Sequence, residues 1–304
     1  MRFLRRLEGE KVNFNEALDK RAAIVEEALD RYLPSADVYP QILHQAMRYS
    51  VMSGGKRLRP VMVMAVAEAA GGKADNVLPA ACALEMIHSY SLIHDDLPAM
   101  DDDDYRRGRP TNHKIYGEAM AILAGDALLT MAFGLLAKCS NSRPEDVVKV
   151  IAEVAAAAGT SGMIGGQVVD TFSAGEEINA DTLEYIHRNK TGALYRAAVR
   201  TGAILAGAEE KKLAVLTEYA EYLGLAFQIK DDILDIEGDA AKIGKPVGSD
   251  LKNNKATYPS LFGMAQAKKK ACQAADKALS ALKLFGNEAD FLRELVQFVI
   301  ERDF

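Results

Sequence analysis

The sequence predicts an all-α protein, and three observations support that prediction. Prolines stand where the first turn of a helix tolerates them: Pro60 precedes VMVMAVAEAA and Pro144 precedes EDVVKVIAEVAAAA. No alternating run of Val, Ile and Thr is bounded by turn residues, as a β-strand would be. Residues 119–137 are apolar all round, which is typical of a helix buried inside a bundle. We expect one domain over residues 1–304, with roughly ten or more helices around a central apolar cavity.

Turn and capping residues divide the chain into these helices. Glycine pairs at 54–55 and 71–72 separate the early helices. Asp181 is expected to cap a long helix that starts at Thr182. No linker rich in Pro, Gly or Ser interrupts the chain and no tandem repeat is apparent, which favours a single domain.

The composition limits the classes of function. Apolar residues make up 49% of the 304 residues and charged residues 26%, enough for a sizeable core and a polar surface. The net charge of −6 argues against nucleic-acid binding, which needs a basic patch. Cys82, Cys139 and Cys272 are widely spaced, so we interpret them as reduced thiols, not as a disulfide framework or a zinc site.

The chain carries no convincing targeting or membrane segment. Its first residues, MRFLRRLEGEKVNF, are basic but lack the apolar run of a secretory signal. The most apolar stretch, residues 119–137, has Asp126 at its centre, and a carboxylate in mid-bilayer is costly. We therefore expect a core helix, no membrane span and a cytoplasmic location.

An acidic cluster interrupts an apolar helix in SLIHDDLPAMDDDDYRRGRP, residues 91–110. Asp95 and Asp96 end the helix, and Pro98 prevents it from continuing regularly. Asp101 can then turn back towards Asp95, which a straight helix would not allow.

A second cluster, FQIKDDILDIEGD, repeats this pattern downstream. Asp231 and Asp235 lie one helical turn apart on the same face, where like charges repel unless a cation lies between them. Either cluster alone could be a solvated helix end. Two clusters that both interrupt apolar helices favour Mg²⁺, which binds one or two carboxylates and completes its shell with substrate phosphates.

Basic residues complete the expected anion sites. Three arginines at 106, 107 and 109 follow the first cluster and suit phosphate oxygens. GGKRLRP, residues 54–60, sets Lys56, Arg57 and Arg59 before a helix start, which predicts a second, metal-free anion site. A solvated turn is the alternative for this segment. His88 lies two turns before the first cluster, where geometry leaves open a role as a core histidine or as part of the cavity. Two anion sites separated by apolar helices indicate two phosphorylated substrates with apolar tails.

These motifs closely resemble the trans-isoprenyl diphosphate synthases (polyprenyl synthetases), and among them most the bacterial farnesyl diphosphate synthases (geranyltranstransferases). GGKRLRP, DDLPAMD, RRGRPTNH, GDALL, KTGAL, FQIKDDILD and GKPVGSDLKNNKATYP occur in family order between residues 54 and 259. The resemblance implies the all-α isoprenoid-synthase bundle, usually a homodimer.

The resemblance also implies the reaction, a prenyl transfer. An allylic diphosphate, dimethylallyl and then geranyl, loses diphosphate to several Mg²⁺ ions, for which Mn²⁺ is a possible substitute. Isopentenyl diphosphate attacks the allylic cation, and farnesyl diphosphate results. No nucleic-acid partner is implied.

Residue roles follow from the matching motif positions. The implied metal ligands are Asp95, Asp101 and Asp231, supported by Asp96 and Asp235. The implied cations on the allylic diphosphate are Arg106, Lys190 and Lys245, with Lys255 as a further contact. Thr191 and Gln228 resemble the dipoles that face the developing carbocation. The implied isopentenyl diphosphate site comprises Gly55, Lys56, Arg59, His88 and Arg107.

The product length depends on what blocks the growing tail. Tyr90 is the first bulky aromatic residue on the path down from Asp95, beside the small Ser91. A core tyrosine is the alternative, but in the family an aromatic here accompanies C15 products and a smaller residue C20 products. Geranyl or geranylgeranyl diphosphate synthesis, a terpene cyclase and a non-catalytic subunit of a heteromeric synthase are the rival functions.

Overall fold

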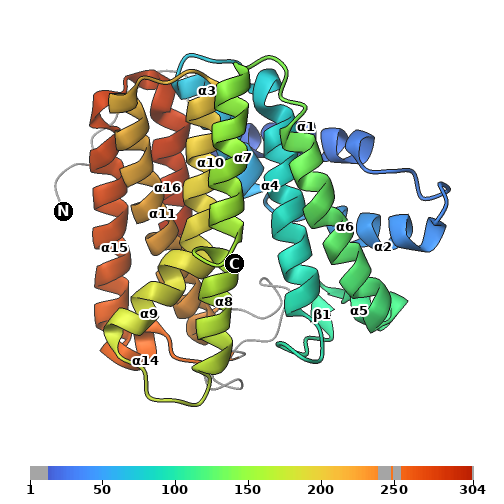
Figure 1. Cartoon of the computed structure of the whole chain (residues 1–304). Helices are drawn as coiled ribbons and strands as arrows, with labels where there is room; N and C mark the ends of the chain where they lie inside the picture. Colours follow the sequence, from blue (N-terminus) through green and yellow to red (C-terminus); the bar gives the residue numbers. More distant parts are fainter. Residues whose placement is uncertain (1–12, 239–247, 249–254, 303–304) are drawn as a thin grey trace.

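A computed structural model describes residues 13–238, 248 and 255–302, and these form a helical bundle (Figure 1). The first half contains the helices α1 (Phe14–Tyr32), α2 (Gln41–Val51), α3 (Leu58–Ala69), α4 (Ala74–Asp95), α5 (Asn112–Tyr116) and α6 (Glu118–Leu136). The second half contains α7 (Pro144–Ala158), α8 (Met163–Phe172), α9 (Ala180–Ile186), α10 (Gly192–Leu205), α11 (Glu210–Glu237), α14 (Tyr258–Phe262), α15 (Met264–Ala281) and α16 (Asp290–Glu301). The predicted all-α fold is confirmed.

Short elements connect these helices. A π-helical turn, η1 (His187–Thr191), joins α9 to α10, and two 3₁₀ turns, η2 (Leu282–Leu284) and η3 (Asn287–Ala289), precede α16. A two-residue antiparallel ladder pairs β1 (Tyr105–Arg106) with β2 (Arg109–Pro110). The sequence did not predict this hairpin, because two residues per strand leave no alternating pattern to detect.

The long helices α4, α10 and α11 form the centre of the bundle. α11 packs on α10 and α15, while α4 packs on α3 and α6 (Figure 1). Most of the α3 and α10 side chains are buried in one continuous apolar core. α4 and α11 both end at the lower end of the view in Figure 1, so both aspartate clusters lie at that end of the molecule.

Glycines let three helices approach closely. A Cβ on Gly202 of α10 would collide with the backbone of Val63 in α3, and a Cβ on Gly224 of α11 would lie 3.2 Å from Cα of Gly192. Close backbone approach of this kind needs a residue without a side chain. These contacts fix how far α3, α10 and α11 lie from one another.

Pro144 begins α7 as predicted, but the predicted cap at Asp181 is wrong. Asn179 is the N-cap of α9, and its side chain accepts a hydrogen bond from the backbone N–H of Thr182. Asp181 instead lies in the first turn of α9, where its charge faces the positive end of the helix dipole. Asn and Asp are equally good caps, so the sequence alone did not separate them.

α6 is not buried on all sides, which corrects a second expectation. Ile122 and Leu123 are 44% and 53% exposed, and Asp126 lies on the exposed face, while the opposite face packs on α4 and α2. Residues 118–136 and 144–172 are each long and apolar enough to cross a membrane, by length and composition only. Both stretches contact other helices of the bundle.

Candidate active site

The first aspartate cluster turns back on itself as predicted. The Asp101 N–H donates to the Asp95 carbonyl at 2.9 Å, so the loop after Pro98 brings these two residues together. Asp96 takes a different direction: it is buried, and Arg106 donates to its Oδ1 at 2.6 Å. Burial raises the pKa of Asp96 to about 6, against the opposing effect of Arg106. Asp95 therefore lines the cavity with Asp101 folded back beside it, while Asp96 holds Arg106.

Two lysines lie between the carboxylates of this site. Lys190 Nζ lies 2.6 Å from Asp170 and 4.0 Å from Asp95, and Lys255 Nζ lies 2.8 Å from Asp101 and 3.7 Å from Asp170. Burial opposes the charge of Lys255, but Asp170 and Asp101 more than compensate and raise its pKa. Lys190 and Lys255 likewise lower the pKa of Asp170 although burial alone would raise it. Lys190, Lys255, Asp170, Asp95 and Asp101 therefore form one compact network of ion pairs.

Asp170 and Gln167 are site residues that the sequence reasoning missed. Gln167 and Asp170 both lie on α8, in the run MIGGQVVDTF. The Gln167 side-chain amide donates a hydrogen bond to the Asp95 carboxylate. The detectable signal was a polar pair at i and i+3 inside an apolar helix. Position 166 needs a glycine, because a Cβ added there would collide with the backbone of Lys190. The glycine lets α8 pack directly on the π-helical turn that carries Lys190 and Thr191.

The second aspartate cluster divides its carboxylates between different partners. Asp231 pairs with Arg302 at 2.6 Å, near the end of the described chain. Asp232 is buried and accepts hydrogen bonds from the Tyr258 N–H at 2.9 Å and from Gln228 at 3.0 Å. It therefore has a structural role, holding the start of α14 against α11. Asp235 is buried one turn after Asp231.

A hydrogen-bonded chain joins the two clusters. The Thr191 hydroxyl donates to Oε1 of Gln228 at 2.6 Å, and the Gln228 amide donates to Asp232. Lys190, next to Thr191, reaches Asp95. Because its only hydrogen is used, the Thr191 hydroxyl has lone pairs left to face the cavity that it lines.

The predicted anion segment at 54–60 brings basic side chains close to the cavity. Arg107 donates to the Gly54 carbonyl, and a Cβ on Gly55 would lie 2.7 Å from the Arg107 guanidinium. Arg59 lines the main cavity with His88. Burial and then the charge of Arg59 lower the pKa of His88 well below its usual value, so it is a neutral imidazole.

Arg57 does not belong to this anion site, contrary to the prediction. Its side chain is buried and pairs with Glu85 at 2.7 Å, and it donates to the Val51 carbonyl at 2.6 Å. Arg57 has a φ of 49°, a left-handed conformation that turns its side chain inwards, whereas Arg59 lines the cavity. The sequence of basic residues does not show that the Arg57 side chain points in a different direction from its neighbours. Lys56 lies with Nζ 5.4 Å from the centre of the Phe298 ring.

A cavity of about 420 Å³ connects the charged site to the apolar interior. Asp95, Lys190 and Arg59 lie among its polar lining residues. Met163 of α8, Leu194 of α10 and Tyr90 of α4 are among the residues that complete the wall. This volume lies within the range of about 300–1,000 Å³ typical of small-molecule sites. The arrangement suits a ligand with a charged head and an apolar tail.

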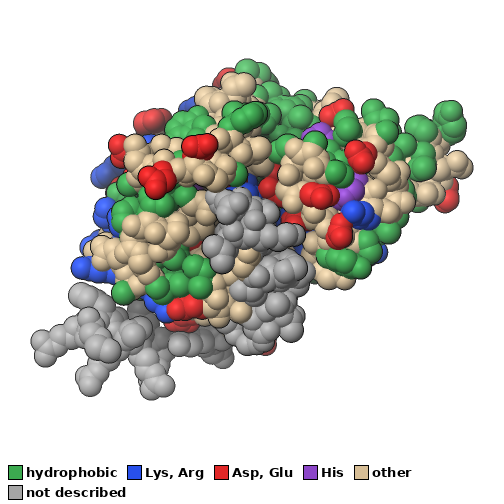
Figure 2. All heavy atoms as spheres, turned by 90° about the horizontal axis from the view of Figure 1, so that it is seen from below, with side chains coloured by type: hydrophobic (Ala, Val, Ile, Leu, Met, Phe, Trp, Pro, Cys, Tyr) green, Lys and Arg blue, Asp and Glu red, His purple; other side chains and the backbone are tan. Residues whose placement is uncertain are grey.

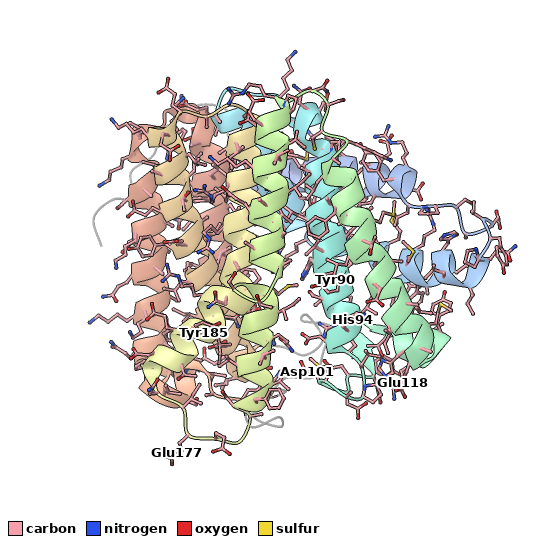
Figure 3. The ribbon with its side chains drawn as sticks, in the orientation of Figure 1. Tyr90, His94, Asp101, Glu118, Glu177 and Tyr185 are labelled. Carbon is pink, nitrogen blue, oxygen red and sulfur yellow. The ribbon has the colours of Figure 1, made fainter. Side chains whose placement is uncertain are left out.

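Tyr90 and Ser91 both line this cavity, as the sequence predicted. Figure 3 shows Tyr90 and His94 on α4 above Asp101. Tyr90 is 5% exposed, and its ring meets the edge of the His94 ring at 5.7 Å and 80°. Within the part of the chain that the structure describes, the Tyr90 hydroxyl has no hydrogen-bond partner, so the ring is held by packing.

His94 in turn depends on Gly125 of the GDALL motif. Its Nε2 lies 3.1 Å from the Ile122 carbonyl, and a Cβ on Gly125 would collide with the imidazole. The sequence alone could not show why position 125 is a glycine, because the residue that it contacts, His94, lies 31 positions earlier in the chain.

Lys245 lies outside the described residues. Seen from below, the surface carries both acidic and basic side chains (Figure 2). The fold and the site thus define a class: an all-α enzyme with a carboxylate-rich entrance to an apolar cavity.

Comparison with known proteins identifies the family. Residues 40–296 match the polyprenyl synthetase family model, and the chain belongs to that family. Its members are prenyltransferases, and this protein is a prenyltransferase that makes isoprenyl diphosphates.

Several relatives are similar over nearly their whole length. The chain is 48% identical to a farnesyl diphosphate synthase of Geobacillus stearothermophilus, covering 94% of this chain and 98% of that protein. It is 49% identical to a geranylgeranyl diphosphate synthase of Cyanophora paradoxa, covering 96% and 98%. A crystal structure of an FPP/GFPP synthase from Zymomonas mobilis superposes with a TM-score of 0.85 at 35% identity, covering 95% and 99%. The relatives thus include enzymes named for different product lengths.

Proposed function

We propose that the protein condenses isopentenyl diphosphate with dimethylallyl and then geranyl diphosphate to give farnesyl diphosphate, with Mg²⁺ as cofactor. The observation that carries this proposal is the 420 Å³ cavity, which has Asp95 and Lys190 at its charged end and the buried ring of Tyr90 in its wall. A charged entrance fits a diphosphate, and a bulky wall residue limits the tail.

The carboxylates fit a set of Mg²⁺ ions chemically. They are hard oxygen donors, and burial, together with the like charge of Asp101, raises the pKa of Asp95. Asp95, Asp101 and Asp231 would hold the metal, with Asp235 supporting and Asp96 acting through Arg106. When bound, Mg²⁺ neutralises the charge that develops on the leaving diphosphate. Mn²⁺ has the same preference for oxygen ligands and can replace it.

The cations around these carboxylates would bind the allylic diphosphate. Arg106 is held by Asp96, and Lys190 and Lys255 already lie among the aspartates. Lys245, predicted for the same role, is assigned by motif only. On substrate binding, the lysines would exchange carboxylate oxygens for diphosphate oxygens, which they contact equally well.

The isopentenyl diphosphate site is proposed at the metal-free cluster. Its residues are Gly55, Lys56, Arg59, His88 and Arg107. Arg107 occupies the space that Gly55 leaves open, and neutral His88 can donate a hydrogen bond without adding charge. No carboxylate ligand of the metal set belongs to this cluster, so substrate binds there through cations alone.

The bond changes follow from this placement. The C1–O bond of the allylic substrate breaks, and diphosphate leaves with the electron pair. The double bond of isopentenyl diphosphate attacks C1 to form the new C–C bond. The resulting cation then loses a proton to the released diphosphate. Thr191, oriented by Gln228, presents oxygen lone pairs that stabilise the positive charge in a site closed to water.

Alternative functions are opposed by specific features. A terpene cyclase takes one diphosphate and has no use for the Gly55–Arg107 cluster. A non-catalytic subunit would not need the intact aspartates at 95, 101 and 231. Geranylgeranyl diphosphate synthesis is the second candidate, because the relative from Cyanophora paradoxa carries that name. Tyr90 favours C15 over C20 and over C10.

We also propose that the chain is one domain and forms a homodimer in the cytoplasm. The exposed apolar residues Ile122 and Leu123 of α6, with Val148 of α7, support an interface between two copies. Light scattering of the purified protein tests this assembly: a mass of about twice 33.0 kDa is expected.

An assay for prenyl transfer tests the function. Purified protein with both dimethylallyl and isopentenyl diphosphate should release diphosphate only when both substrates and Mg²⁺ are present. Diphosphate release from an allylic substrate alone would favour the terpene cyclase.

A further inference from the structure

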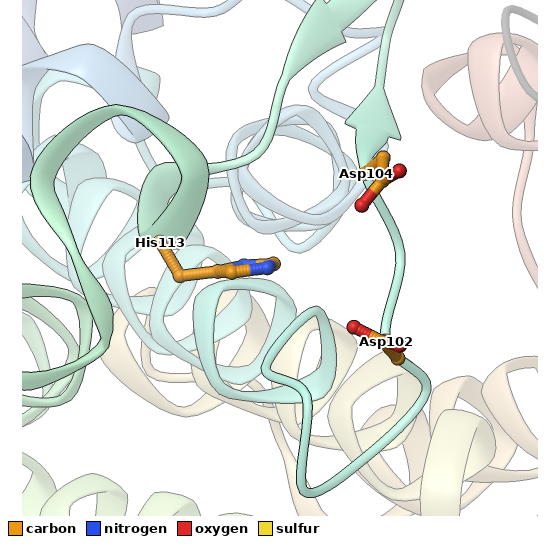
Figure 4. A group of neighbouring side chains, drawn as sticks. All are labelled: Asp102, Asp104 and His113. Carbon is orange, nitrogen blue, oxygen red and sulfur yellow. The ribbon is translucent and has the colours of Figure 1, made fainter.

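A second set of possible metal ligands lies on the other side of the acidic loop. Figure 4 shows His113, at the start of α5, pointing towards Asp102 and Asp104. One ligand atom from each of these three side chains lies within 4.8 Å of the other two. None of them contributes to the cavity described above.

The backbone separates this set from the active site. Asp102 has a φ of 51°, the left-handed conformation that turns the chain sharply. Its neighbour Asp101 points to Lys255, while Asp102 points to His113. Two consecutive aspartates thus serve opposite faces of one loop.

The hydrogen bonds of His113 fix its tautomer. The Thr111 hydroxyl donates its one hydrogen to the Asp103 carbonyl at 2.8 Å, so it must accept from His113 Nδ1–H, 3.2 Å away. Nε2 is then a bare lone pair. His113 is 6% exposed, and its buried Nε2 has no hydrogen-bond partner among residues 13–238, 248 and 255–302.

A lone pair facing two carboxylates is unfavourable unless a cation lies between them. Leaving a buried polar atom unsatisfied costs about 1–3 kcal/mol. Metal–ligand bonds of about 2.0–2.2 Å place ligands on opposite sides of an ion about 4 Å apart. The three ligand atoms lie within 4.8 Å of one another, so one ion could contact all three with small side-chain movements. Lys114 Nζ lies 2.6 Å from Oδ1 of Asp104 and can turn outwards, because its side chain is 43% exposed.

We propose that Asp102, Asp104 and His113 bind one divalent transition-metal ion, separate from the Mg²⁺ of the active site. An imidazole nitrogen with two carboxylates suits Zn²⁺, Co²⁺ or Mn²⁺, whereas Mg²⁺ prefers oxygen ligands alone. Water would complete the shell on the exposed side. The bound ion would tie the acidic loop to α5 and so restrain Asp101. This proposal does not depend on the product made by the enzyme.

Zn²⁺ binding to the full chain, measured calorimetrically without any diphosphate, tests the site. Three variants are compared with wild type: Asp95→Asn/Asp231→Asn, which disables the active-site carboxylates, His113→Asn and Asp102→Asn. Asn tolerates the left-handed conformation at 102, so the last variant removes charge without strain. We expect one Zn²⁺ to bind wild type and the double variant alike. Binding should weaken at least about tenfold in the other two, since even outer-sphere changes cost about 10–100-fold.

Two results would overturn the proposal. Equal Zn²⁺ affinity in wild type, His113→Asn and Asp102→Asn would show that these side chains are not ligands. Loss of binding in the double variant alone would assign the ion to the active site. If His113→Asn fails to fold, the exposed Asp102 still gives the answer. Co²⁺ in place of Zn²⁺ adds a spectroscopic check, because its visible bands should change on loss of a nitrogen ligand.

Discussion

The Nζ atom of Lys255 lies 2.8 Å from Oδ1 of Asp101, although 154 positions separate the two residues. Lys190 holds Asp170 in the same way at 2.6 Å. In this state the lysines neutralise the carboxylates that are proposed to bind Mg²⁺. The same cations can move to the diphosphate when the metal arrives, so the charges of the site remain balanced throughout.

Loss of either aspartate cluster should abolish efficient turnover. Asp95→Asn or Asp231→Asn removes a proposed metal ligand without changing side-chain size, and kcat should fall by about 10²–10³, as for one lost electrostatic stabiliser. Steady-state kinetics at saturating Mg²⁺ measures it. Asp181→Asn, an exposed change in the first turn of α9, serves as the control and should leave kcat unchanged. Near-normal turnover in either cluster variant would remove that residue from the metal set.

Two neighbouring arginines should behave differently. Arg59→Ala should raise the KM for isopentenyl diphosphate about 10–150-fold, the worth of a hydrogen bond to a charged group, and that for geranyl diphosphate far less. Arg57→Leu should instead lower the free energy of unfolding by about 3–5 kcal/mol, because Glu85 is left buried and unpaired. Equal KM effects of Arg59→Ala on both substrates would refute the separation of the two sites.

Gly55 should be intolerant of a side chain because of Arg107. Gly55→Ala places a Cβ 2.7 Å from the guanidinium, so the KM for isopentenyl diphosphate should rise. Gly71→Ala is the matched control: its φ of 95° is also positive, but no atom lies within 4 Å of the new Cβ. Both changes cost about 1–2 kcal/mol of backbone strain. A normal KM in Gly55→Ala would show that Arg107 does not bind this substrate.

The His94–Gly125 contact should affect product length through Tyr90. Gly125→Ala displaces His94, whose ring packs on Tyr90, and the product mixture from dimethylallyl and isopentenyl diphosphates should broaden. Gly134→Ala on the same helix meets no atom within 4 Å and should be neutral or slightly stabilising. Product chromatography compares the two variants. An unchanged product from Gly125→Ala would mean that His94 does not position Tyr90.

The sequence predicted what local rules determine. Pro144 begins its helix, and Pro98 allows Asp101 to return to Asp95, because both effects act within a few residues. Arg57 could not be separated from Lys56 and Arg59, since a positive φ reverses its direction without a glycine to mark it.

Contacts between distant segments were beyond prediction from one chain. Arg302 meets Asp231 across 71 positions, and nothing in a single arginine near the end of the chain indicates this pair. The exposed apolar face of α6 was also not predicted. An apolar helix in a buried core and one whose surface a second copy could cover have the same sequence pattern.

The chain length of the product tests the central claim most directly. Dephosphorylated products from dimethylallyl and isopentenyl diphosphates are separated by chromatography for wild type and for Tyr90→Ala. Farnesol, C15, should dominate for wild type, and longer alcohols should appear in the variant, because removal of the ring deepens the cavity. A C20 main product from wild type, or an unchanged C15 product from Tyr90→Ala, would contradict the account.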